Sequence, residues 1–273
     1  MLFYSIPRLI FALCVRLPRT LWDIITFRRP ITYSFKRERH IRVVHAPSEN
    51  GKRVAERFGL NDHLYYSGPM YSGHIHTILG GARLPKRVEY ERELPPAEDG
   101  NPICLDWLRT EKTPKGIVFV VPGLGNYSQT PYIQRMSEEA CAMGFHICIM
   151  TVRGMGSAPL QVAKFASVTF TEDVRWTMKK YLQEANIKEK FGQALSIVAI
   201  GFSAGGSMLT KAVAEEGASG DGSVIPFRAV ICVTAPYDME THSATMLSFM
   251  GKLLYQRPLM VALRRFAQKH KNC

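Results

Sequence analysis

The sequence predicts an α/β fold in which a mostly parallel central sheet has helices on both faces. Short, apolar, β-rich runs alternate with segments of helical spacing, which is the order typical of a largely parallel sheet. Two of these runs, at 116–121 and 195–200, end in glycine-rich turns. The chain has 273 residues, of which 46% are hydrophobic, so it can bury a sizeable core.

The sheet is expected to begin with two short strands of the antiparallel type, Arg87–Leu94 and Ile103–Leu108, separated by the proline-containing loop 95–102. The later strands are expected at 117–121, 145–151, 195–200 and 227–233. The helices between them are expected at about 132–143, from Thr171 to about Glu184, and at 205–216. Glu172 and Asp173 favour the second helix because negative charge is stabilising in a first turn.

The turn after the strand at 195–200 reads Gly201-Phe202-Ser203-Ala204-Gly205-Gly206, which is typical of a nucleophile elbow. A serine on a sharp strand-to-helix turn adopts a strained backbone conformation, and the residues two before and two after it pack closely. Gly201 and Gly205 provide the small residues that this requires. The pattern predicts that Ser203 is a catalytic nucleophile, with a plain glycine-rich turn as the alternative.

A second glycine-containing turn, Pro122-Gly123-Leu124-Gly125-Asn126, follows the run at 116–121. A serine hydrolase needs two backbone N–H donors for its oxyanion, one after the nucleophile and one in the loop after an earlier central strand. Ala204 and Leu124 occupy these two places, so we expect them to form an oxyanion hole. An ordinary strand-to-helix turn is the alternative for either motif taken alone.

Several stretches, taken in chain order, resemble the α/β-hydrolase superfamily and within it the YheT-like branch, which includes membrane-anchored abhydrolase-domain lipases and esterases. They lie at 72–78 (SGHIHTI), 121–125 (VPGLG), 153–157 (RGMGS), 170–173 (FTED), around Ser203, and at 234–238 (TAPYD). The resemblance covers roughly residues 60–265 and implies the α/β-hydrolase fold, with Ser203 as nucleophile of an ester hydrolase. Pro122 is a departure, because the family usually has a histidine before the glycine.

The resemblance also implies a triad acid and a histidine on loops after later strands, which this chain lacks. We therefore expect a fragment without the last strands, with an unpaired sheet edge and an exposed apolar patch. Asp238 is a possible acid, although a structural role in the loop after the strand at 227–233 is the favoured interpretation. His242 follows that strand too closely to be the base, and His270 lies in a basic tail.

The chain is expected to comprise an N-terminal membrane-associating segment, 1–57, and a hydrolase domain, 58–273. The first 27 residues are apolar but interrupted by arginines, with Pro7 and Pro18 breaking a continuous helix. A segment lying in the bilayer interface is therefore favoured over a spanning helix, and a short signal-anchor is the alternative.

Charge is concentrated at the two ends of the chain. The net charge is +12, and residues 1–57 hold 12 Lys or Arg against 4 Asp or Glu, while residues 252–273 hold 6 basic residues and no acidic ones. Basic ends on a nearly neutral body favour attraction to the headgroups of anionic lipids. No nucleic-acid-binding motif accompanies the basic tracts, so we do not expect a nucleic-acid partner.

Two further observations limit the chemistry. The six cysteines, at positions 14, 104, 141, 148, 232 and 273, have no metal-ligand spacing, so neither a metal nor a cofactor is expected. The segment 242–270 has apolar residues at helical spacing and is expected to form helices that either cap the active site or simply pack.

Two functions remain open on the sequence alone. The first is a serine hydrolase of carboxylic esters, such as acylglycerols or phospholipids, that acts at a membrane with Ser203 as nucleophile and Leu124 and Ala204 as oxyanion donors. The second is a catalytically inactive, membrane-bound binding protein of the same fold. The elbow favours the first function, and the missing histidine favours the second.

Overall fold

The structure is a computed structural model that describes residues 47–57, 87–156, 160–219, 225–247 and 251–271. The chain divides into two compact units, Met1–Arg83 and Leu84–Cys273. In the first unit the described residues form the helix α4 (Glu49–Arg57), in which Ala55 is buried. The expected apolar segment at the N-terminus and the stretch 72–78 lie outside the described residues. None of the helices that the structure describes is long and apolar enough to cross a membrane.

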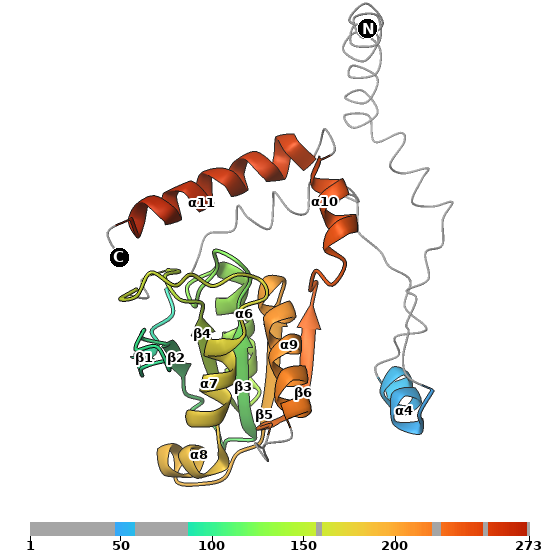
Figure 1. Cartoon of the computed structure of the whole chain (residues 1–273). Helices are drawn as coiled ribbons and strands as arrows, with labels where there is room; N and C mark the ends of the chain where they lie inside the picture. The colour runs from blue at the N-terminus through green and yellow to red at the C-terminus, as the bar shows by residue number, and fades with distance from the viewer. Residues whose placement is uncertain (1–46, 58–86, 157–159, 220–224, 248–250, 272–273) are drawn as a thin grey trace, which may run out of the picture. The chain divides into compact units, whose positions relative to one another are not determined.

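The second unit contains a six-stranded sheet in the order β1-β2-β4-β3-β5-β6 (Figure 1). The first two pairings, β1 with β2 and β2 with β4, are antiparallel, and the other three are parallel. The strands are β1 (Glu91–Glu93), β2 (Cys104–Leu108), β3 (Gly116–Val121), β4 (Phe145–Thr151), β5 (Ile197–Phe202) and β6 (Phe227–Val233). The expected mostly parallel sheet with an antiparallel start is therefore present.

Helices cover both faces of this sheet. On one face α6 (Pro131–Ala142) contributes Ile133 to a cluster with Val118, Val120, Ile147 and Ile149. On the other face α7 (Glu172–Lys180), α8 (Glu184–Phe191) and α9 (Ala204–Ser219) pack on the larger core cluster, which includes Phe119. All six residues of β3 are buried, because a central parallel strand has helices on both sides.

The strand register determines where the site forms. Val121 at the end of β3 pairs with Gly201 near the end of β5, and Phe202 pairs with Val233 at the end of β6. Parallel strands place their carboxyl ends at one edge, and ligands bind at that edge in open α/β sheets. The loops after β3, β5 and β6 are therefore neighbours.

Several predicted boundaries agree with the structure, and others need correction. Strands β4 and β6 have the predicted limits. The helix expected from Thr171 to about Glu184 is wrong in length: α7 ends at Lys180, and a separate helix, α8, starts at Glu184. Between them the chain turns at Tyr181, which lets the fully buried Leu182 enter the core. The strand expected at Arg87–Leu94 is reduced to β1.

The segment after β6 is helical, as expected for 242–270. It comprises α10 (Met239–Leu247), the π-helical turn η2 (Gly251–Gln256) and α11 (Arg257–Lys269). Near the end of α11, Phe266 packs on a small cluster around Val152, Met155 and Met208. The Nζ of Lys269 donates a hydrogen bond to the Gly156 carbonyl at 2.8 Å, so the end of α11 is attached to the loop after β4.

Strand β6 forms one edge of the described sheet. Its side chains are far more exposed than those of β3, and Ile231 and Val233 have exposed fractions of 48% and 37%. The expected unpaired edge and apolar patch are present in the part of the chain that the structure describes.

Candidate active site

Ser203 lies on the turn between β5 and α9 with a φ of +50°. A left-handed backbone is costly for a residue with a side chain and is a form of strain that clusters at functional sites. Its N–H donates to the Val233 carbonyl at 2.9 Å, and its carbonyl accepts from the N–H groups of Gly206 and Ser207. Ser203 is exposed at the carboxyl edge of the sheet, so its hydroxyl is open to a ligand.

The glycines on either side of Ser203 allow this turn. A Cβ on Gly205 would lie 2.3 Å from the Val121 carbonyl oxygen, and one on Gly201 would lie 2.5 Å from the Gly206 Cα. Both contacts are with backbone, which cannot move aside as a flexible side chain can. The first turn of α9 is thereby packed directly against the end of β3.

The loop after β3 lies against the serine. A Cβ on Gly123 would be 3.1 Å from the Ser203 Cβ, so the backbone that leads into Leu124 lies directly against the serine. Ala204 is the first residue of α9, and its N–H has no acceptor within the helix. Among the described residues no acceptor takes the N–H of Leu124. Their oxyanion role stays a prediction.

Tyr132 belongs to this site but was missed by sequence reasoning. Its hydroxyl oxygen accepts a long hydrogen bond of 3.5 Å from the Gly123 N–H, and its ring packs edge-on against Phe202 at 5.0 Å between centroids. Burial raises the pKa of Tyr132, and the bond from Gly123 partly offsets the rise. The phenol therefore stays protonated at neutral pH, and it contacts the backbone of the loop after β3 at Gly123.

The loop after β6 contributes a second strained residue. Thr234 has a φ of +52°, and with Ser203 it completes the set of non-glycine residues with positive φ in the described part of the chain. The two lie at the ends of adjacent strands that are joined by the bond from the Ser203 N–H to Val233. The next side chain, Ala235, limits the space at Gly206, where a Cβ would lie only 2.9 Å away.

The structure does not bring His270 to Ser203. Its Nε2 lies 2.9 Å from the Gly154 carbonyl oxygen, and its ring packs against Phe266 at 4.9 Å between centroids. His242 lies on α10, and its side chain is outside the described atoms.

Asp238 caps the start of α10. Its Oδ1 accepts from the Thr241 N–H at 3.0 Å, and its Oδ2 accepts from the Thr241 hydroxyl at 2.5 Å. This is the capping geometry typical of aspartate before a helix. The acid role of Asp238 stays a prediction, and the capping bonds favour the structural interpretation.

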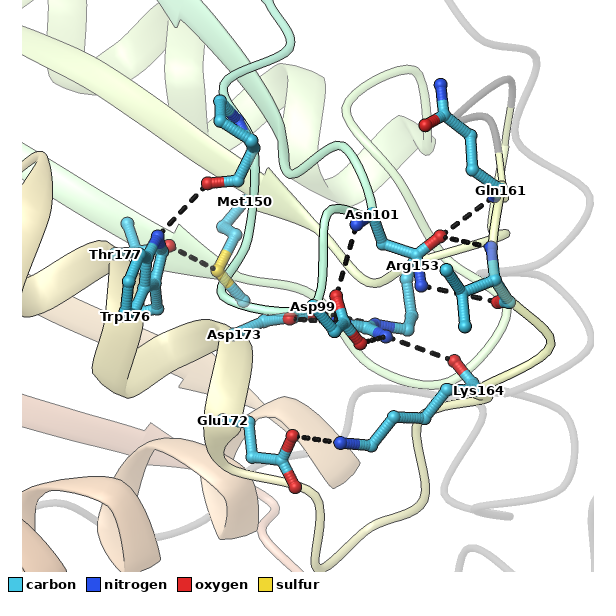
Figure 2. A network of polar contacts seen from close by, with 12 residues as sticks. Asp99, Asn101, Met150, Arg153, Gln161, Lys164, Glu172, Asp173, Trp176 and Thr177 are labelled. Carbon is cyan, nitrogen blue, oxygen red and sulfur yellow. Dashed lines mark hydrogen bonds and ion pairs between the residues drawn. The ribbon is translucent and has the colours of Figure 1, made fainter.

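A buried ionic network holds the loop after β4, and the sequence did not predict it (Figure 2). The side chain of Arg153 is only 2% exposed, and its Nε donates to Asp173 at the start of α7 at 2.8 Å. Its Nη1 donates to Asp99 at 2.7 Å and to the Lys164 carbonyl at 3.2 Å. Phe170 covers the guanidinium from 4.8 Å.

The pKa shifts of Arg153 and Asp99 both favour the charged forms of the two side chains. Burial lowers the pKa of Arg153, but hydrogen bonds to Asp173 and then Asp99 outweigh it, and the net pKa is raised. The hydrogen bond from Arg153 lowers the pKa of Asp99. Both groups are therefore charged at neutral pH, and together they fix the backbone at Gly154, which accepts from His270.

The described residues contain no cluster of His, Cys, Asp and Glu that could hold a metal ion. Of the cysteines there, Cys104 and Cys148 are buried, and burial raises the pKa of the Cys104 thiol to about 12. Cys141 and Cys232 are only partly buried.

Three relatives are similar to this chain in sequence. The putative esterase YheT of Escherichia coli (strain K12) is 30% identical over 181 residues, which are 65% of this chain and 48% of the relative. Abhydrolase domain-containing protein 2 of Drosophila melanogaster is 26% identical over 153 residues, or 54% of this chain and 36% of the relative. An embryogenesis-associated protein of Picea glauca is 24% identical over 213 residues, or 74% and 44%.

The chain thus spans less than half the length of each of these relatives. No family model matches it.

Proposed function

We propose that this chain, which belongs to the α/β-hydrolase superfamily, is the nucleophile-bearing part of a carboxylic ester hydrolase. The observation that carries the proposal is Ser203, exposed and held at a φ of +50° between two parallel strand ends, with the Gly123 backbone against it. Relatives named as an esterase and an abhydrolase-domain protein support the same chemistry.

In this mechanism the Ser203 hydroxyl attacks the ester carbonyl carbon. The carbonyl oxygen then carries the negative charge of the tetrahedral intermediate, and the backbone N–H groups of Leu124 and Ala204 stabilise it. The alcohol leaves, and water hydrolyses the acyl-serine. A serine hydroxyl is a weak nucleophile at neutral pH, so a base must take its proton. We assign the base and its acid partner to the part of the protein that corresponds to the remaining length of the relatives.

We further propose that the substrate is a membrane lipid ester and that the chain is of the YheT-like branch. The ordered motifs at 121–125, 153–157 and 234–238 support the branch. The apolar, arginine-containing N-terminus supports association with an anionic membrane, because such segments bind by apolar insertion and headgroup attraction. Exposed apolar side chains of Leu124, Tyr237 and Met239 near the carboxyl edge would favour an acyl chain.

A catalytically inactive, membrane-bound binding protein is the second candidate. The observation that favours it is that no described residue forms a hydrogen bond with the Ser203 hydroxyl. A triad without its base retains only roughly 10³ to 10⁴-fold catalysis over water.

The deciding experiment measures hydrolysis of a soluble p-nitrophenyl ester by the chain and by the native protein that contains it. Ser203→Ala is expected to lower the rate by at least about 10³-fold, because the nucleophile is lost. Ser207→Ala is the matched control on the same helix, since among the described residues its hydroxyl bonds only to the Pro236 carbonyl at 3.4 Å. A fluorophosphonate probe should label Ser203 in the wild type, as read by peptide mass spectrometry.

The same experiment can overturn the proposal. If the folded native protein neither hydrolyses the ester nor takes the probe at Ser203, the binding-protein function replaces the hydrolase. Activity that survives Ser203→Ala would assign the chemistry to another nucleophile.

A further inference from the structure

The helical segment after β6 carries an unusual excess of positive charge. Between 251 and 271 every charged residue is basic, and they are Lys252, Arg257, Arg264, Arg265, Lys269 and Lys271. No acidic side chain in the described part of the chain pairs with any of them. The charge therefore faces solvent uncompensated.

The segment also exposes large apolar side chains beside these cations. Leu253, Met260 and Val261 have exposed fractions of 47%, 44% and 47%. The body-facing side of α11 is marked by Phe266 and the buried His270. The opposite side, by helical spacing, is the stripe Arg257, Val261, Arg264 and Gln268, with Met260 at its flank.

We propose that η2 and α11 form a docking surface for the headgroup layer of an anionic membrane. Arginine stems lie along apolar surface while their guanidinium groups reach phosphates, and basic segments are attracted to anionic lipid surfaces. Exposed Met and Val side chains between the arginines provide the shallow apolar insertion that interfacial helices use. Positive charge alone would attract nucleic acid and an anionic lipid surface equally. The exposed apolar side chains favour the lipid surface.

The attachment of α11 gives this docking a consequence for the site. Phe266, Lys269 and His270 hold the end of α11 to the loop after β4, at the carboxyl edge of the sheet where Ser203 also lies. Docking through α11 would direct that edge toward the lipid layer. This orientation, unlike the docking itself, rests on the proposed hydrolase function.

The first experiment measures binding of the full chain to vesicles. Those of equimolar phosphatidylcholine and phosphatidylserine are compared with vesicles of phosphatidylcholine alone, by co-sedimentation. The triple variant Arg257→Gln, Arg264→Gln, Arg265→Gln is expected to lose roughly tenfold to a hundredfold in affinity for the anionic vesicles. The matched control replaces three exposed cations of the body, Arg135→Gln, Lys188→Gln and Arg228→Gln, and should lose less than about threefold.

A second measurement locates the helix independently of the N-terminal segment. Val261→Trp places an indole on the outward side of α11, and brominated lipids in the anionic vesicles should quench its fluorescence. Met143→Trp, on an exposed body residue at the end of α6 and before β4, at the opposite edge of the sheet, is the control and should show no added quenching. If the N-terminal segment alone binds every variant to both vesicle types, co-sedimentation does not separate the variants. The quenching measurement then decides whether α11 docks.

The proposal is overturned if the indole on α11 is quenched no more than the control. It is also overturned if the two triple variants bind the anionic vesicles with the same affinity where binding is measurable. Displacement of the chain from the vesicles by a single-stranded oligonucleotide at equal phosphate concentration would overturn it as well. Circular dichroism confirms that each variant is folded. Hydrolysis of the soluble ester needs no vesicle, so failure of docking and failure of the hydrolase are read separately.

Discussion

At the scale of single residues, the position of Arg153 illustrates how a buried charge is retained. A guanidinium that is 2% exposed loses most of its hydration, and only good hydrogen-bonding geometry compensates for that loss. Asp173 accepts from two nitrogens of Arg153, while Asp99 and the Lys164 carbonyl satisfy the remaining donors (Figure 2). Three segments distant in sequence are thereby joined at one cation.

Removing one partner should therefore be costly. Asp173→Asn leaves the buried Arg153 with one carboxylate partner, Asp99, instead of two. We expect the free energy of unfolding to fall by about 3 kcal/mol. The neighbouring Glu172→Gln is the matched control, because Glu172 pairs with Lys164 at an exposed position and should cost less than about 1 kcal/mol. Urea denaturation measures both. Equal losses would mean that the buried pair contributes no more than a surface one.

At the scale of elements, the strands with continuous apolar runs could be predicted from sequence. The limits of β4 and β6 agree because uninterrupted apolar runs, at 147–150 in β4 and 229–233 in β6, mark a strand directly. The strand predicted from Arg87 is shorter in the structure because β1 pairs with β2 only over Glu91–Glu93. Pairing partners are a property of the fold rather than of the local sequence.

The site was predictable only where a motif is local. The elbow at Ser203 and the glycine turn at Gly123 are contiguous in sequence, and both lie where expected. Tyr132, Thr234 and the network of Arg153 depend on contacts between distant segments, so periodicity could not reveal them. The break before α8 was missed because the burial of Leu182 depends on the core around it.

The junction of α9 with β3 makes an element-scale prediction. In Gly205→Ala the new methyl would lie 2.3 Å and 2.4 Å from the carbonyl oxygens of Val121 and Pro122, so the helix must move away from the strand. We expect a loss of about 1 to 3 kcal/mol in stability and loss of probe labelling at Ser203, since the turn is displaced.

Gly217→Ala on the same helix is its control. A Cβ there meets only Ile225 at 3.9 Å, and alanine favours a helix, so stability should be unchanged or rise by up to about 1 kcal/mol. Thermal denaturation and fluorophosphonate labelling are the two measurements. Normal labelling in Gly205→Ala would show that the close approach is not needed to form the elbow.

At the scale of the whole molecule, the sheet is covered unevenly. Strand β3 lies inside the sheet and β6 lies at its edge (Figure 1). All six residues of β3 are buried, whereas several side chains of β6 are exposed. Val230 packs against the larger core cluster, so by alternation Ile231 lies on the opposite face of the sheet, where it is 48% exposed. An apolar edge strand of this kind is a template for pairing with another chain.

The chain by itself is therefore expected to self-associate through β6, and Ile231→Lys should reduce that association. A lysine on an edge strand opposes pairing by charge repulsion, and an exposed position limits the loss of stability to about 1 kcal/mol or less. Light scattering after size-exclusion chromatography, over a series of protein concentrations, measures the monomer fraction. Val54→Lys on α4, at a similar exposed fraction of 46%, changes the net charge equally without replacing a residue of the sheet. If both variants raise the monomer fraction alike, net charge and not the β6 edge governs association. An effect specific to Ile231→Lys identifies β6 as the surface that must be covered in the native protein.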